Sequence, residues 1–244
     1  MDFVRQYAEN SIKVLKQIWD NEFERIDLAG TYIADTLEKN GLLYAFGCGH
    51  SHMIEEELFY RAGGLAAVYP MFDTSTMLHE GAAKSSQIER MSGYADKIVA
   101  RYPLTKKDTV LVASTSGINS FIIEFAQACK AKGAKVIGIT SFAYLQKPSR
   151  HPEGLHLYDV VDLAIDNHVP SGDATVVVCE DGTKAGPVSS LATLAICNLL
   201  EMSACQTLRE RGIDPEVFRS GNIAGSDEYN AKLIRKYQGK IRSL

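Results

Sequence analysis

The sequence predicts an α/β fold in which helices cover both faces of a parallel sheet. From residue 42 onward, short apolar runs end in loops rich in glycine or serine, and each loop leads into a segment with helical periodicity. Strands that alternate with helices in this way form parallel sheets buried on both faces. The 244 residues, 45% of them hydrophobic and 23% charged, contain no repeat, low-complexity segment or dividing linker. We therefore expect one domain over residues 1–244.

The elements follow from these patterns in chain order. Apolar residues between positions 3 and 39 recur at helical spacing, and the polar pair Asp20–Asn21 marks a break, so two helices are expected there. The expected strands cover residues 42–46, 66–70, 109–115, 135–140, 160–166 and 174–178. The later expected helices run from the first loop to about residue 61, near 84–97, over 120–133, roughly over 187–211 and near 226–241.

Charge and cysteine content narrow the class of protein. With 26 Lys and Arg against 30 Asp and Glu, the net charge of −4 predicts neither a nucleic-acid partner nor a membrane surface. The five cysteines form no C-x-x-C pair, which argues against a zinc ribbon or a dithiol redox site. The polar N-terminal helix lacks the apolar core of a signal peptide, so a cytoplasmic protein is expected.

The first candidate binding loop is "GCGHS", residues 47–51, directly after the first expected strand. Gly47 and Gly49 allow a tight turn and a close approach of a ligand to the backbone around His50. Ser51 stands where a helix begins and can cap it or donate to a bound group.

The second candidate loop is "STSGINS", residues 114–120, which follows a strand in the same way. Ser114, Thr115 and Ser116 stand at the strand end, Gly117 at the turn, and Asn119 or Ser120 at the start of the next helix. Hydroxyls together with free amides at a helix N-terminus form a phosphate site without any lysine. Ligands of parallel sheets bind beyond the carboxyl ends of the strands, where both loops are expected.

Other kinds of site fit the first loop less well. The dinucleotide pattern G-x-G-x-x-G is not completed, because His52 takes the place of the third glycine, and no Walker lysine is present. A zinc site from His50, His52 and Glu56 is the rival interpretation. Because histidines two residues apart on a helix point in different directions, we favour a phosphate cradle and expect neither metal nor cofactor.

These motifs resemble the sugar isomerase (SIS) domain family, whose members bind phosphosugars. "GCGHS" matches the family's G-x-G-x-S loop, "STSGINS" matches its S-x-S-G loop, and "KGAKVIGITS" (132–141) and "GPVSSLATLAICNLL" (186–200) are similar to its later elements. The resemblance spans about residues 30–210 and is nearest to a little-characterised subgroup often labelled phosphoheptose isomerase. Asn119 stands where the family commonly has Thr or Ser.

The resemblance implies a doubly wound, five-stranded parallel sheet of flavodoxin type with extra N- and C-terminal helices. It also implies a homodimer with sites near the subunit interface. It does not decide the reaction, because relatives include isomerases, an ether-cleaving lyase and non-catalytic phosphosugar sensors. A sugar-phosphate aldose–ketose isomerase is the main expectation, and the lyase and the sensor remain alternatives.

Proton transfer between sugar carbons requires a carboxylate or an imidazole. Glu57, four residues before Arg61, is a candidate base or a surface ion pair. Phosphoheptose isomerases carry the corresponding glutamate about one turn further on, where this chain has Arg61. Glu89 is the second candidate base, and His79 and His168 stand in or beside loops at strand ends, where they can assist or simply be solvated.

Overall fold

The computed structural model describes residues 2–244, and its centre is a five-stranded parallel sheet. The strands are β1 (Leu43–Gly47), β2 (Val68–Pro70), β3 (Thr109–Ala113), β4 (Lys135–Thr140) and β5 (Leu163–Asp166). Their order in the sheet is β2-β1-β3-β4-β5, and every neighbouring pair is parallel. The expected flavodoxin-type sheet is therefore confirmed.

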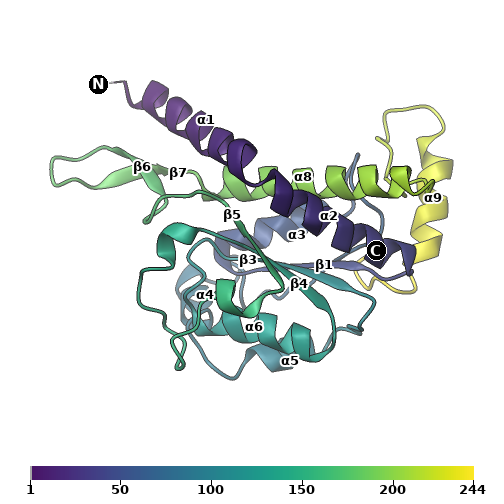
Figure 1. Ribbon diagram of the computed structural model, residues 1–244, viewed down its shortest axis with the longest axis horizontal. Coiled ribbons are helices and arrows are strands. Elements are labelled where there is room, and N and C mark those ends of the chain that lie inside the picture. Colours follow the sequence, from purple (N-terminus) through teal and green to yellow (C-terminus); the bar gives the residue numbers. More distant parts are fainter. Residues whose placement is uncertain (1) are drawn as a thin grey trace.

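Helices cover the sheet on both sides (Figure 1). On one side lie α1 (Phe3–Asn21), α2 (Phe23–Glu38), α3 (Met53–Leu58) and α8 (Ser189–Glu210). On the other lie α4 (Ala82–Ile88), α5 (Ala95–Val99), α6 (Ser120–Ala131) and α7 (Leu157–Val160), with α9 (Ser226–Tyr237) at one end of the molecule. Short 3₁₀ turns cover Gly49–His52 and Phe142–Tyr144.

The two-residue period of the strands creates a core on each face. Tyr44 and Phe46 of β1 enter the core under α5 and α6, where the Phe46 ring stacks on Phe125 with centroids 3.8 Å apart. Leu43 and Ala45 enter the opposite core, under α2 and α8. Because both faces are covered, the strand is apolar along its whole length. This continuous apolar run is what predicted the strand from the sequence.

Two expected helices are interrupted or shorter in the structure. The helix expected near residues 84–97 is two helices, α4 and α5, because Gly93 between them adopts φ +78°. The helix expected to reach about residue 61 ends at Leu58, where the extended backbone of Phe59 turns the chain toward β2. The interruption at Gly93 and the end of α3 at Leu58 thus depend on backbone conformation, which the periodicity of the side chains does not report.

The strand expected at 174–178 lies outside the main sheet. As β6 (Ala174–Val177) it pairs antiparallel with β7 (Lys184–Pro187). This hairpin packs on α1 instead, since Asn10 donates to the Thr175 carbonyl at 3.1 Å and the Tyr7 hydroxyl to the Pro187 carbonyl at 2.9 Å. Contacts between segments 165 or more residues apart in the chain place the hairpin, and no local pattern indicates them.

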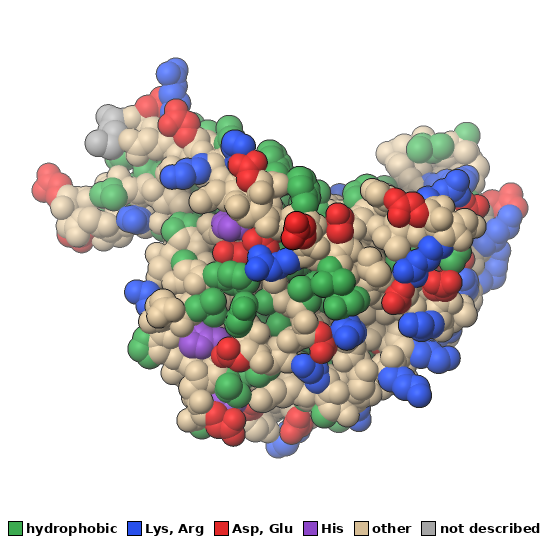
Figure 2. Space-filling model, in the orientation of Figure 1, with side chains coloured by type: hydrophobic (Ala, Val, Ile, Leu, Met, Phe, Trp, Pro, Cys, Tyr) green, Lys and Arg blue, Asp and Glu red, His purple; other side chains and the backbone are tan. Residues whose placement is uncertain are grey.

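Helix α1 and the hairpin project from the body of the molecule as an arm (Figure 1). The expected apolar stripe of α1 is only partly covered: Ile18 is fully buried, whereas Phe3, Tyr7 and Trp19 keep 36–44% of their surface exposed. Hydrophobic side chains follow the upper edge of the molecule over α1 and α2 (Figure 2). The arm thus leaves several large apolar side chains partly in contact with water.

Helix α8 is a core helix. By length and composition it is the one helix among residues 2–244 that could cross a membrane, but half of that stretch is buried in the fold. A Cβ on Gly30 of α2 would lie 2.2 Å from the Ser203 Oγ of α8, so glycine lets these two helices meet closely. Close packing on α2 and on the sheet accounts for the apolar character of α8.

A buried carboxylate on α8 makes the stability of this packing depend on pH. Glu201 is 3% exposed and its Oε1 accepts the Leu65 amide at 3.0 Å. Burial raises its pKa to about 7. The folded chain therefore holds a proton on Glu201 at pH values where the unfolded chain, with a pKa of 4.5, has lost it.

We predict that this group stabilises the fold fully below pH 4.5 and that its contribution is lost as pH rises through about 7. The difference between the two pKa values corresponds to about 3 kcal/mol. Glu201→Gln, which keeps the acceptor oxygen, should remove this part of the pH dependence. Between pH 5 and pH 8 the free energy of unfolding of the native protein should therefore fall by about 2–3 kcal/mol relative to that of the variant. Urea unfolding at fixed protein concentration measures it. Exposed Glu210→Gln on the same helix is the matched control, and equal pH profiles for native protein and Glu201→Gln would contradict the prediction.

Candidate functional site

The strand order places the two glycine- and serine-rich loops side by side. After β1, the chain adds β2 on one side of β1 and then β3 on the other side, so the strand order switches between β1 and β3. In such sheets the cleft beyond the carboxyl ends of these two strands is the usual ligand site. Gly47, the last residue of β1, pairs in register with Ala113, the last residue of β3. The loops beginning at Cys48 and Ser114 therefore leave the sheet next to one another.

The first loop is a compact turn built on its glycines. A Cβ on Gly47 would lie 2.3 Å from the Ser51 carbonyl oxygen, and Gly49 adopts φ +56°. The Gly49 amide donates to the Thr76 carbonyl at 2.9 Å, which ties the turn to the loop after β2. His50 is exposed and Ser51 is half-buried, so both side chains reach the surface of the cleft.

The second loop presents backbone donors at the start of α6. The Ser114 Oγ accepts the Gly117 amide at 3.2 Å, and Gly117 adopts φ +62°. A Cβ at this position would lie 2.5 Å from Thr140 Oγ1, so glycine is required both by conformation and by space. Within residues 2–244, the amides of Ser116, Ile118 and Asn119 have no hydrogen-bond acceptor.

The side chains of Asn119 and Ser120 are committed elsewhere. Asn119 Oδ1 accepts from the Arg150 guanidinium at 2.6 Å, and the Ser120 hydroxyl donates to the Arg150 carbonyl at 2.8 Å. Both residues are buried. They fix a cation beside the N-terminus of α6, a feature that the sequence did not reveal because thirty residues separate Arg150 from the loop.

The N-terminus of α8 closes the cleft between the loops. The cleft lining combines both loops with the start of this helix: His50, Ser51, Met53, Ile54, Thr115, Ser189, Ser190, Thr193 and Leu194. Thr115 Oγ1 accepts from the Asn167 amide at 3.2 Å, and the same amide group contacts Thr193 at 3.3 Å. Ser189, Ser190 and Asn167 were not predicted from the sequence, although "PVSS" before a long helix has the same hydroxyl-rich helix start as the other loops.

The two candidate bases differ in how they are held. The Glu57 carboxylate pairs with Arg61 and accepts from Asn198 at 2.7 Å, so both neighbours compete with any substrate. Glu89 is half-buried at the end of α4, and its carboxylate has no hydrogen bond or ion pair with residues 2–244. Glu89 also lies close enough to the first loop to raise the pKa of the buried Cys48 thiol, after the larger effect of burial itself.

Glu55, unlike its two neighbours in the run of glutamates, is fully buried. Its Oε1 accepts the Gly47 amide at 3.1 Å, and its Oε2 has no partner among the described residues. Burial raises the pKa of this carboxyl well above its ordinary value. Glu55 thus holds the glycine loop from the protein interior, a role that only the three-dimensional structure reveals.

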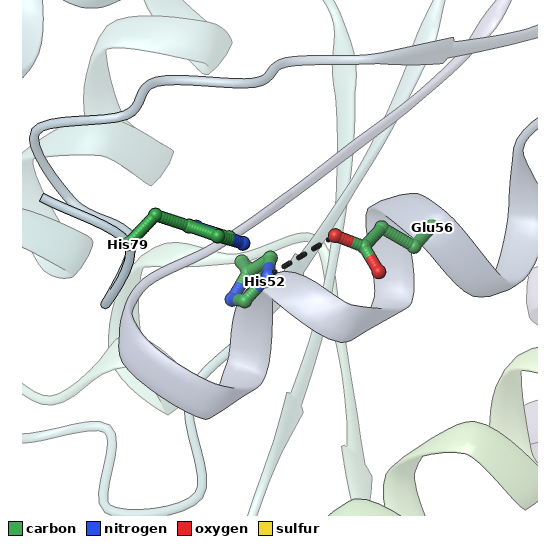
Figure 3. Close-up of side chains that lie close together, drawn as sticks. All are labelled: His52, Glu56 and His79. Atoms are coloured by element: carbon green, nitrogen blue, oxygen red, sulfur yellow. Dashed lines mark ion pairs between the residues drawn. The ribbon is translucent and has the colours of Figure 1, made fainter.

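His79 lies against the first loop, on the side away from the second. Its ring meets the His52 ring edge-on with centroids 5.3 Å apart, and the His52 Nε2 lies 3.3 Å from Glu56 Oε1 (Figure 3). The expected divergence of His50 from His52 is correct, since His50 is exposed whereas His52 is buried. It is His79, from the loop after β2, that approaches His52.

His168 belongs to a separate cluster at the end of β5. Its Nε2 lies 3.1 Å from Oε1 of the buried Glu22, its Nδ1 lies 3.6 Å from Asp166 Oδ2, and its backbone adopts φ +54°. The break between α1 and α2 falls at Glu22 and so serves to bring this carboxylate to the sheet edge. The cluster opens on a cleft of about 450 Å³ between α1, β5 and the hairpin, which Lys13 and Lys184 also line. No sequence motif around Glu22 or Asp166 predicts that these residues contact His168.

Comparison with known proteins agrees with the fold. Residues 6–141 match the family model described as SIS domain. A UPF0309 protein of Geobacillus thermodenitrificans is 41% identical over 242 residues, which cover 99% of this chain and 97% of that protein. A UPF0309 protein of Listeria innocua is 39% identical, covering 99% and 98%.

Solved structures show the same fold at low sequence identity. A phosphoheptose isomerase from Francisella tularensis superposes with a TM-score of 0.55 at 19% identity, over 84% of this chain and 97% of that one. The sugar isomerase domain of an RpiR transcription factor from Sphaerobacter thermophilus gives a TM-score of 0.51 at 13% identity, over 98% and 99%. The chain therefore belongs to the SIS family of phosphosugar-binding domains, and within that family to the UPF0309 proteins.

Proposed function

We propose that the cleft between the loops after β1 and β3 binds the phosphate group of a sugar phosphate. The observation that carries this proposal is the set of free amides at Ser116, Ile118 and Asn119, which directly precede α6 and have no acceptor within residues 2–244. A phosphate oxygen can satisfy such free backbone donors while interacting favourably with the helix dipole. The protein's net charge of −4 makes such local donors necessary for holding an anion.

Each loop residue has a distinct part in this proposal. The Ser51, Thr115 and Ser116 hydroxyls donate to the phosphate together with the free amides. Gly47, Gly49 and Gly117 give the backbone its close approach, while Ser114 holds the second turn through the Gly117 amide. His50 contacts the sugar at the exposed side. Asn119 and Ser120 act through Arg150, whose charge favours an anion at the same helix start.

For the reaction, we favour aldose–ketose isomerisation with Glu89 as the base. Glu89 is a carboxylate near the first loop that no described residue engages, whereas Glu57 is held by Arg61 and Asn198. His79 and His168 are candidates for assisting proton transfer. The phosphoheptose isomerases that share the fold support isomerisation as the reaction. The likeness to the sugar domain of a transcription factor supports the second candidate, a phosphosugar sensor without catalysis.

We further propose that the arm formed by α1 and the hairpin pairs with a second copy of the chain. Its apolar side chains Phe3, Ile12 and Trp19 keep 43–62% of their surface exposed within residues 2–244. Symmetric pairing of two such arms would bury them in a closed twofold dimer. The cleft beside His168 lies between this arm and the sheet, so a partner seated on the arm would also wall that cleft.

Sugar phosphates should raise the melting temperature of the protein. A ligand at a hundred times its Kd adds about 2.7 kcal/mol, or roughly 5–10 °C for a chain of this length. Ser51→Ala and Ser116→Ala should each weaken binding at least about tenfold, because each removes a donor to a charged group. Thermal-shift titration with a panel of sugar phosphates measures this. Ser171→Ala, in an exposed loop, is the control, and a panel that leaves the native protein's melting temperature unchanged would contradict the phosphate site.

An isomerase should exchange the C2 proton of its sugar phosphate with solvent. In D₂O, mass spectrometry should detect deuterium at C2, and Glu89→Gln should lower the exchange rate about 10²–10⁴-fold while phosphate binding persists. Glu80→Gln, an exposed glutamate in the same segment, is the matched control. Binding without exchange across the panel would favour the sensor, and release of D-lactate from a lactyl-ether substrate would identify the lyase.

The dimer is tested by light scattering on the purified protein. We expect a mass of about twice the 26.8 kDa of one chain at micromolar concentration. Ile12→Asp combined with Trp19→Asp should shift the mass to that of one chain, because a buried unpaired carboxylate in an apolar contact is costly. The control is Arg242→Asp, a charge reversal at the opposite end of the molecule. A native protein of 26.8 kDa would overturn the arm as an interface.

A further inference from the structure

The side chains of His52, Glu56 and His79 converge at the start of α3 and the loop after β2 (Figure 3). We propose that these three residues form a binding site for a divalent transition metal, with zinc the best match to their two imidazoles and one carboxylate. This inference does not rest on the proposed phosphate site. It stands on four features of the three side chains.

The first feature is the spacing of the ligand atoms. With metal–nitrogen and metal–oxygen bonds of about 2.0–2.1 Å, two ligands of a tetrahedral zinc lie about 3.3–3.4 Å apart. The His52 Nε2 and Glu56 Oε1 are 3.3 Å apart. One ligand atom from each of the three residues lies within 4.8 Å of the others, and His79 is exposed enough to complete the set by a side-chain rotation.

The second feature is the fixed orientation of the His52 ring. Its Nδ1 is hydrogen-bonded to the Gly49 carbonyl, and because a carbonyl only accepts, Nδ1 carries the proton. In the neutral imidazole the lone pair is then on Nε2, facing the Glu56 carboxylate. Two acceptors at 3.3 Å repel unless a proton or a metal ion stands between them. The hydrogen bond to a backbone carbonyl is also the usual outer support of a metal-binding histidine.

The third feature is the lack of other partners. Among residues 2–244, neither the Glu56 carboxylate nor the His79 imidazole receives a hydrogen bond. The second cluster of similar composition, at His168, is different. There the Glu22 carboxylate is engaged by Arg25 and by the Asp166 amide, and the Asp166 carboxylate accepts the Phe142 and His168 amides. Hydrogen bonds explain the His168 cluster without a metal, and they leave the His52 cluster unexplained.

The fourth feature is access. The Glu56 side chain is 58% exposed and His79 is at the surface, so an ion enters without opening the core, whereas the His52 ring is 9% exposed and held in place. Three protein ligands leave a fourth position for water or another ligand. The site therefore has the ligand number of an open centre rather than that of a closed structural zinc.

The test uses the whole native chain and Co²⁺ as a coloured substitute for Zn²⁺. After treatment with chelator, we expect Co²⁺ to produce visible d–d absorption that saturates at one ion per chain and is displaced by Zn²⁺. His79→Ala and Glu56→Gln, both at exposed positions, should each weaken Zn²⁺ binding at least about tenfold without loss of folding, because each removes a ligand. His52→Ala alters a buried ring and serves only as a supporting variant.

The control is His151→Ala, which removes a histidine from the loop after β4, where Ser149 contacts both the His151 amide and the Ile118 carbonyl. Its Zn²⁺ affinity should equal that of the native protein. Absence of saturable Co²⁺ absorption, or unchanged Zn²⁺ affinity in both His79→Ala and Glu56→Gln, would overturn the proposal and leave a simple ion pair between protonated His52 and Glu56. Because no sugar phosphate is present, the outcome is independent of the phosphate-site experiments.

Discussion

The parallel pairing of β1 with β3 is the constraint on which the rest of the structure depends. It sets Gly47 opposite Ala113, so the two loops leave the sheet at the same height and at the point where strand order reverses. Both strands are buried on both faces, under α2 and α8 on one side and α5 and α6 on the other, as is usual for parallel strands. A slip of one residue would move Tyr44 and Phe46 into the wrong core and separate the loops.

Hydrogen bonds from two other parts of the fold hold the backbone of the first loop at this edge of the sheet. The Gly47 amide is held by Glu55 from inside the protein, and the Gly49 amide by the loop after β2. Burial raises the pKa of Glu55 well above its ordinary value, which disfavours a buried negative charge beside the proposed anion site. A backbone held in place by such hydrogen bonds is what a pre-organised binding site requires.

Histidine and carboxylate side chains gather at two places along the same edge, and their surroundings differ. At the end of β5, Glu22, Asp166 and His168 form a network in which nearby amides and Arg25 satisfy the carboxylates. At the start of α3, His52, Glu56 and His79 form a set whose acceptors face one another. The two clusters have similar composition but different surroundings, because hydrogen-bond donors satisfy the carboxylates of the first, whereas the Glu56 carboxylate of the second is 58% exposed and accepts no hydrogen bond from residues 2–244.

Local sequence determined much of this protein. Apolar strands and hydroxyl-rich turns predicted the sheet and both loops, because buried strands are apolar on both faces and turns at strand ends require glycine. The break between α1 and α2, the end of α6 near Gly133 and the long α8 also follow from periodicity and glycine placement. The departure of β6 and β7 from the sheet did not, since it depends on Asn10 and Tyr7, more than 160 residues away.

Tertiary structure decided the surroundings of each functional side chain. Three successive glutamates look alike in the sequence, yet Glu55 is buried under Gly47, Glu56 faces His52, and Glu57 is held by Arg61 and Asn198. Likewise, only folding brings His79 to His52, Glu22 to His168 and Arg150 to the start of α6. Periodicity reports which face of an element is buried, but contacts between distant segments depend on how the elements pack, and that information is distributed over the whole chain.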